Sequence, residues 1–208
     1  GAVWRGVGAR QFVYVPGKRN DRVVLVAHAD TFWEMLGIYQ KEVSELLFED
    51  GVVKNAWGGL GADDRAGCAI LWLLKDLGHS ILVTAGEENG GLGSEWLMNE
   101  NPDIRYEINE KSCFAISLDR RNGRDFKCYS VGTDEFRKYI IASTGYSEPN
   151  RYSYTDIVTL CEKICGVNLS IGYYNEHNND EFMVLDEWLH TLNICRIWLK
   201  NPIKSFRR

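Results

Sequence analysis

Four continuous apolar runs are the strongest pattern along the chain. They are rich in aliphatic and β-branched residues and show no regular alternation with polar ones. Such runs are typical of strands that are buried on both faces. The sequence therefore predicts four inner strands of a sheet, at Arg22–Ala27, Ser80–Ala85, Cys113–Leu118 and Leu169–Tyr173.

Between these runs lie stretches with helical spacing or helix-start signals. The predicted helices are a buried one from the Asp63-Asp64 pair to about Leu77, a short one capped by Ser94 and running through Met98, one over Tyr154–Cys165, and a last one over Asp180–Lys200, capped by Asp180-Glu181 and stopped by Asn201-Pro202.

Weaker patterns complete the outline. Gln11–Val15, Val52–Lys54 and Phe126–Ser130 are predicted as further strands, Thr31–Phe48 as irregular or partly helical, and Asp134–Ser143 is ambiguous. No repeat or linker interrupts the chain. Strands that alternate with helices predict one α/β domain over residues 1–208, with a largely parallel or mixed sheet flanked by helices.

Side chains that can bind a metal follow each of the four apolar runs. In chain order they are His28 and Asp30, Glu87 and Glu88, Asp119, and His177. Asp63 and Asp64 enter from a helix start, within a stretch with four glycines in ten residues, Gly58–Gly67. Because the carboxyl ends of parallel strands meet at one edge of a sheet, with strands about 5 Å apart, we expect these side chains to share a small site.

The residue types favour zinc or a similar divalent ion. Two histidines and three carboxylates form a mixed nitrogen and oxygen set, whereas a plain magnesium site for phosphate transfer favours carboxylates, phosphate and water. Five ligands would crowd one zinc; two ions that share a carboxylate would each have three protein ligands and room for water. A pair of ions can activate water, and Glu87 is the candidate for the further acid that moves its proton.

These residues, in this order, resemble the co-catalytic dizinc exopeptidases. The resemblance rests on His28-x-Asp30, Gly59–Gly67, Glu87-Glu88, Asp119 and His177, and extends from about Val23 to the final helix. The superfamily includes peptidase T-like tripeptidases, the tetrahedral aminopeptidases and single-domain bacterial dizinc aminopeptidases. The resemblance implies a three-layer α/β/α sandwich with a mixed, mostly parallel central sheet.

The resemblance also implies a role for each residue. Asp63 would bridge two Zn²⁺ ions, with Co²⁺ or Mn²⁺ as alternatives. His28 and Asp119 would complete one metal site, and Glu88 and His177 the other. Glu87 would be the general base and then the acid, Asp30 would orient His28, and a cis peptide bond would follow Asp63.

Many relatives insert a lid or dimerisation domain between the last two ligands. Only 57 residues, positions 120–176, separate Asp119 from His177 here, and they must also form strands and a helix. We therefore expect no lid domain. Since the deacylases and carboxypeptidases of the superfamily often take a substrate-binding histidine from the lid, its absence favours an aminopeptidase.

Other polar and aromatic residues have simpler interpretations. We expect Asp64 to cap or hydrogen-bond without touching metal, Asp156 to cap a helix, and His79 and His190 to have surface or packing roles. Salt bridges are favoured for Arg120 and Arg121 over binding of a substrate carboxylate. Phe32 and Trp33 follow the His28 strand, where a pocket lining and core packing remain equally open.

Composition narrows the function further. The net charge of -5 argues against a nucleic-acid surface, and no apolar run approaches the roughly 18–20 residues needed to span a bilayer. The six cysteines form no Cys-x-x-Cys pair and are expected as reduced, mostly buried thiols of a cytoplasmic protein. The first residue is Gly, which leaves a trimmed chain open, and no segment resembles a signal peptide.

The sequence thus predicts a soluble metallopeptidase that removes residues from the free N-terminus of short peptides. Two alternatives stay open: an amidohydrolase or deacylase acting on N-acylated amino acids or cell-wall peptides, and a non-catalytic binding module of the same fold. The oligomeric state is also left open.

Overall fold

A seven-stranded sheet forms the centre of the computed structural model, which describes residues 1–37, 45–150 and 154–208. The strand order is β1-β2-β6-β3-β7-β9-β8. The bounds are β1 Val3–Val7, β2 Arg10–Val15, β3 Val24–His28, β6 Ser80–Thr84, β7 Ala115–Arg120, β8 Phe126–Lys127 and β9 Gly166–Ser170. The four inner strands run parallel, and β1, β2 and β8 pair antiparallel towards the edges.

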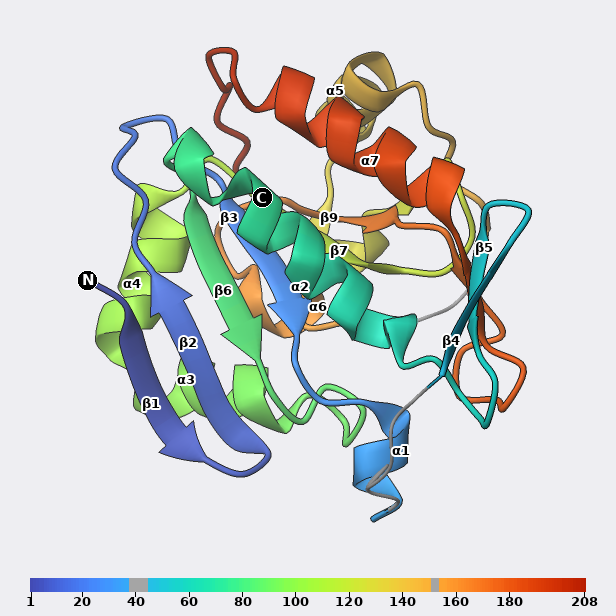
Figure 1. Cartoon of the computed structure of the whole chain (residues 1–208). Coiled ribbons are helices and arrows are strands. Elements are labelled where there is room, and N and C mark those ends of the chain that lie inside the picture. Colours follow the sequence, from blue (N-terminus) through green and yellow to red (C-terminus); the bar gives the residue numbers. More distant parts are fainter. Residues whose placement is uncertain (38–44, 151–153) are drawn as a thin grey trace.

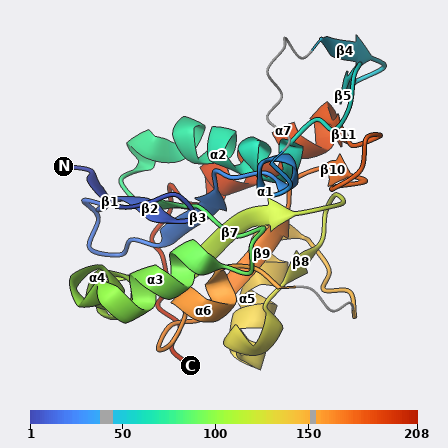
Figure 2. The ribbon, with the colours of Figure 1, turned by 90° about the horizontal axis from the view of Figure 1, so that it is seen from below.

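Helices cover both faces of this sheet, which confirms the predicted three-layer α/β/α arrangement (Figures 1 and 2). On one face lie α2 (Ala62–Leu74), α7 (Leu185–Trp198) and α5 (Asp134–Thr144), and on the other α3 (Leu92–Glu100), α4 (Pro102–Lys111) and α6 (Ile157–Leu160). Leu25 and Ala27 of β3 belong to the first core, whereas Val24 and Val26 belong to the second. The apolar runs are unbroken because alternate residues of one strand enter two different cores.

A second, four-stranded antiparallel sheet stands at one end of the molecule, at the right of Figure 1. Its order is β10-β11-β5-β4, with β4 Leu46–Glu49, β5 Val52–Asn55, β10 Tyr173–Tyr174 and β11 Phe182–Val184. The chain leaves β5 towards the glycine-rich stretch and α2, and it turns between β10 and β11 through the loop that carries His177. This small sheet therefore holds two segments of the predicted site beside each other.

Several predicted elements are wrong in their bounds. Ser94 lies inside α3, whose N-cap is Gly91. The last helix begins at Leu185, because Phe182–Val184 pairs with β5 as a strand. Within 154–165 only Ile157–Leu160 is helical.

Other segments were ambiguous or missed. The ambiguous Asp134–Ser143 is the helix α5, capped by Thr133. In Thr31–Phe48 the structure contains α1 (Phe32–Met35) and the start of β4, while positions 38–44 lie outside the described residues. The strand β1 and the helix α4 were not predicted, because neither has a strong apolar period.

No separate lid is present among the described residues between Asp119 and His177, which instead form β8, α5, α6, β9 and β10. None of the described helices is long and apolar enough to cross a membrane. All six cysteines are free thiols, and five of them are buried.

Candidate metal centre

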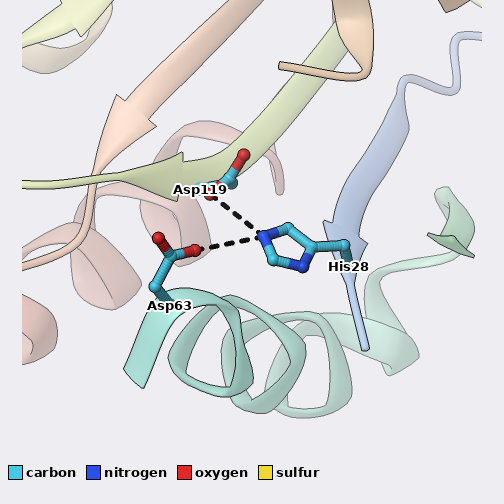
Figure 3. A group of neighbouring side chains, drawn as sticks. All are labelled: His28, Asp63 and Asp119. Carbon is cyan, nitrogen blue, oxygen red and sulfur yellow. Dashed lines mark hydrogen bonds and ion pairs between the residues drawn. The ribbon is translucent and has the colours of Figure 1, made fainter. Parts of the chain in front are cut away.

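Three elements deliver the first group of candidate ligands. His28 is the last residue of β3, Asp119 lies near the end of the neighbouring strand β7, and Asp63 lies in the first turn of α2 (Figure 3). His28 Nε2 lies 3.1 Å from Asp63 Oδ1 and 3.5 Å from Asp119 Oδ1. All three residues are shielded from solvent at the edge of the sheet, where the carboxyl ends of the parallel strands meet.

A second group forms on the other side of Asp63. His177 Nε2 lies 2.9 Å from Glu88 Oε2 and 3.3 Å from Asp63 Oδ2. In each group the candidate ligand atoms lie within 4.8 Å of one another. Asp63 thus contributes one oxygen to each group, so the five side chains divide into two sets of three that share a single carboxylate.

This donor set fits divalent ions of the zinc type. Each set combines one imidazole with two carboxylates, and three protein ligands leave a four-coordinate ion one position for water. The described residues therefore include groups that could bind metal at the place the sequence predicted.

The Asp64 carboxylate hydrogen-bonds backbone N–H groups of β3 and α2, next to the candidate ligands. Its Oδ2 accepts the His28 N–H and its Oδ1 accepts the Gly67 N–H, both at 3.1 Å. The Asp63–Asp64 peptide bond is cis. Gly67 is required here, since a Cβ at this position would lie 2.2 Å from Leu118 O and 2.3 Å from Asp64 Oδ1. Asp64 thus hydrogen-bonds at the helix start, as predicted for it.

Asp30 lies behind both His28 and the adjacent glutamates. His28 Nδ1 lies 3.0 Å from the Asp30 carbonyl and 3.4 Å from its Oδ1. With the proton assigned to Nδ1, Nε2 faces the ligand group with its lone pair. The Asp30 carboxylate also accepts the backbone N–H groups of Glu87 and Glu88, at 3.4 and 3.3 Å. Asp30 therefore orients the His28 ring and the backbone of Glu87 and Glu88.

Three polar side chains hydrogen-bond Asp119, and none of them was predicted as its partner from the sequence. Thr155 Oγ1 donates to its Oδ2 at 2.8 Å, and the Tyr173 hydroxyl donates to its Oδ1 at 3.3 Å. The Asn168 side chain bonds both backbone groups of Asp119. No local sequence signal marks Thr155 or Asn168, because each reaches Asp119 from a distant segment.

Glu87 lies beside the first group with its Oε2 4.0 Å from His28 Nε2. Burial and the negative charge of Asp119 raise its pKa to about 9. The carboxylates also raise the pKa values of the two imidazoles. Hydrogen bonds to Asp63 and Glu88 raise the pKa of His177 to about 10. For His28, burial favours the neutral form, but Asp119, Asp30 and Asp63 outweigh it and raise the pKa well above its usual value. The site thus attracts positive charge strongly.

Asp156 was predicted to cap a helix. It does occupy the N-cap position of α6, but its side chain makes no capping bond, so the predicted position is confirmed and the predicted contact is wrong. Its carboxylate instead accepts hydrogen bonds from the hydroxyls of Thr84 and Ser94, on β6 and α3. Asp156 therefore links the start of α6 to β6 and α3.

A hollow of about 240 Å³ opens beside the two groups. Its lining includes Asp63, Glu87, Glu88, Asp119, Arg120, Arg121, Tyr129, Tyr154, Tyr173, Glu176 and His177. Arg120 pairs with Asp125 at 2.6 Å and Arg121 with Glu176 at 2.8 Å, so both predicted salt bridges are confirmed.

The aromatic and histidine candidates outside the two ligand groups pack against other side chains or bond the backbone. Phe32 stacks on the His177 ring with centroids 4.5 Å apart, and Trp33 meets Phe32 edge-on. The buried His79 accepts the Val23 N–H and bonds the Leu199 carbonyl, which is a packing role. His190 stacks loosely on Tyr146, away from the hollow.

Solved peptidase structures have the same fold. Aminopeptidase PepT from Bacillus cereus matches with a TM-score of 0.64 at 13% identity, over 91% of this chain and 83% of that one. A tripeptidase from Staphylococcus aureus matches with a TM-score of 0.65 at 14% identity, over 97% and 90% of the two chains. The TET1 peptidase from Pyrococcus horikoshii, which can assemble into a tetrahedron or a large octahedral shell, matches with a TM-score of 0.61 at 14% identity, over 94% and 88%.

No family model and no curated protein matches the sequence. The likeness therefore lies in the three-dimensional structure, and it confirms the expected resemblance at the level of the fold.

Proposed function

We propose that this chain is a metal-dependent exopeptidase of the aminopeptidase type, which removes residues from the free N-terminus of short peptides. The observation that carries the proposal is the position of Asp63, whose two carboxylate oxygens face His28 and His177 at 3.1 and 3.3 Å. The shared fold supports the same class, since the structures that match include an aminopeptidase and a tripeptidase.

We assign the metal ligands from the two groups. His28 and Asp119 would hold one ion, Glu88 and His177 the other, and Asp63 both. The mixed imidazole and carboxylate donors favour Zn²⁺, with Co²⁺ or Mn²⁺ as substitutes. When bound, two such ions would supply an activated water and polarise the scissile carbonyl.

The protein's own residues would move the proton and hold the geometry. Cations bound beside Glu87 would lower the pKa of its carboxyl group, so that Glu87 could take a proton from the attacking water and deliver it to the amine of the leaving group. Asp30 would keep His28 and the backbone of Glu87 in place through the contacts described above. The cavity of about 240 Å³ lies below the usual range of ligand pockets, which favours a short substrate.

Substrate assays separate this proposal from its main alternative. We expect the zinc-loaded protein to hydrolyse aminoacyl-nitroanilides and short peptides with a free N-terminus, and to leave N-acyl amino acids intact. Activity on the acylated set alone would favour the deacylase and overturn the aminopeptidase assignment.

Metal analysis separates both enzymes from a binding module. After exposure to zinc and removal of excess, we expect two ions per chain. Fewer than one bound ion per chain would defeat the catalytic proposal. The free thiols support a reducing compartment, and we propose a cytoplasmic location on that ground.

A further inference from the structure

Glu181 makes a contact that no pattern in the sequence predicted. Its Oε2 accepts the Gly61 N–H at 2.6 Å, and its Oε1 accepts the N–H groups of Ala62 and Asp63 at 2.8 and 3.1 Å. Glu181 is 2% exposed. A buried carboxylate from the loop before β11 thus takes three backbone donors at the start of α2. The sequence had assigned Glu181 to the capping of the last helix, which begins four residues later.

The start of α2 is capped by residues other than Asp63. Glu181 accepts the N–H groups of Gly61, Ala62 and Asp63, which precede the regular helix because Asp63 and Asp64 have non-helical φ and ψ angles. Asp64 accepts the Gly67 N–H three residues later, as an Asp at a helix start ordinarily does. The two carboxylate oxygens of Asp63 instead face the two histidines.

Glu181 also joins two of the three segments that form the second ligand group, those of Asp63 and His177. His177 lies four residues before it in the same loop. The strand β11 follows Glu181 and pairs with β5, the strand that leads into Gly61 (Figure 2). Gly61 adopts a φ of +66°, so the chain turns sharply just where Glu181 holds it. The first group depends less on this contact, because His28 and Asp119 are carried by the central strands β3 and β7.

We propose that Glu181 is a positioning residue for the metal centre: it fixes the Gly61–Asp63 backbone against the His177 loop, so that Asp63 can serve both ions. The inference rests on the proposed metal-dependent function. It predicts that loss of the carboxylate weakens the ion held by Asp63, Glu88 and His177 more than the ion held by His28 and Asp119.

The test is a Co²⁺ titration of wild type and Glu181→Gln, followed by visible absorption of the bound ion. Glutamine has the same length, but its amide nitrogen is a donor and cannot accept the N–H groups that one Glu181 oxygen accepts. We expect the binding step that a His177→Ala variant also weakens to lose about 10- to 100-fold in affinity, the range seen for outer partners of metal sites. The other step should change much less.

Two further variants control for a simple loss of stability. Thr133→Ala removes a capping side chain from α5, far from the ligands, and should lower the melting temperature without changing either binding step. Glu181→Asp keeps the carboxylate on a side chain one methylene shorter and should partly restore the binding step that depends on His177. If the glutamine variant does not fold, Glu181→Asp takes its place in the titration.

The outcomes distinguish this inference from the function on which it rests. A wild-type chain that binds two ions, together with Glu181 variants that bind them equally well, would overturn the role of Glu181 alone. Equal weakening of both steps would also overturn it, in favour of a general structural role. A wild-type chain that binds no ion would overturn the metal centre and this inference with it.

Discussion

His28 and His177 lie against opposite oxygens of one carboxylate, that of Asp63. The Nε2 atoms of the two rings approach its Oδ1 and Oδ2 at 3.1 and 3.3 Å. A buried carboxylate between two imidazoles is what a pair of cations needs in order to share a ligand.

Asp63→Asn should remove metal from both groups. The amide has a single acceptor oxygen, so it cannot serve two cations. We expect the zinc content to fall well below two ions per chain and peptidase activity to drop by more than about 100-fold, the upper range for an outer partner of a metal site. Atomic absorption after dialysis measures the first effect. A variant that retained two ions would exclude Asp63 as the shared ligand.

Glu87→Gln should separate turnover from metal binding. The residue lies beside the first group but in neither set of ligands. Loss of a general acid–base group typically costs about 10²- to 10⁴-fold in rate, and we expect that loss in kcat while the zinc content stays at two. Glu95→Gln, at an exposed position of α3, is the matched control. Full activity of the Glu87 variant would refute its assignment as the base.

Asp30→Asn should weaken metal binding without removing a ligand. The change replaces an acceptor oxygen near His28 Nδ1 and disturbs the bonds from the Glu87 and Glu88 N–H groups. We expect about 10- to 100-fold weaker zinc affinity, measured by competition with a chelator. Unchanged affinity would show that the Asp30 carbonyl alone orients the ring.

Metal affinity should rise with pH. Hydrogen bonds to Asp63 and Glu88 raise the pKa of His177 to about 10, and a bound ion must displace that proton. Below this pKa the proton competes with the ion, so each proton displaced tightens binding by up to about tenfold per pH unit. Zinc affinity measured from about pH 6 to about pH 9, with proton release followed by calorimetry, tests the sign. A flat profile would contradict it.

Gly67→Ala should destabilise the fold at the metal centre. The added methyl group would collide with the Leu118 carbonyl and with Asp64 Oδ1, and the backbone carbonyl cannot swing away. Overpacking of this kind costs about 1–3 kcal/mol in the free energy of unfolding. Gly1→Ala is the control, since a Cβ there meets nothing within 4 Å and this exposed residue has no positive φ. Chemical denaturation of the two variants gives the comparison, and equal stability would contradict the tight contact.

The fold class and most ligand candidates could be predicted from local patterns. An unbroken apolar run predicts an inner strand because both faces of that strand are buried, and the polar residue that follows then lies at the carboxyl edge of the sheet. His28, Glu88 and Asp119 were found in this way, each next to its own strand. Their grouping around Asp63 also required the order of the residues, which resembles that of dizinc exopeptidases.

The partners of Glu181, Asp156 and Asp119 could be decided only by the tertiary structure. Glu181 has the local features of a helix cap, yet Phe182–Val184 pairs with β5 and carries the carboxylate to a different helix start. Asp156 likewise bonds Thr84 and Ser94, which are far away in sequence. Local propensity sets which element a residue can form, but a hydrogen bond between distant segments depends on how the sheets bring those segments together. Local patterns in the sequence therefore predict which side chains reach the candidate site, whereas the residues that hold them there become visible only in the folded chain.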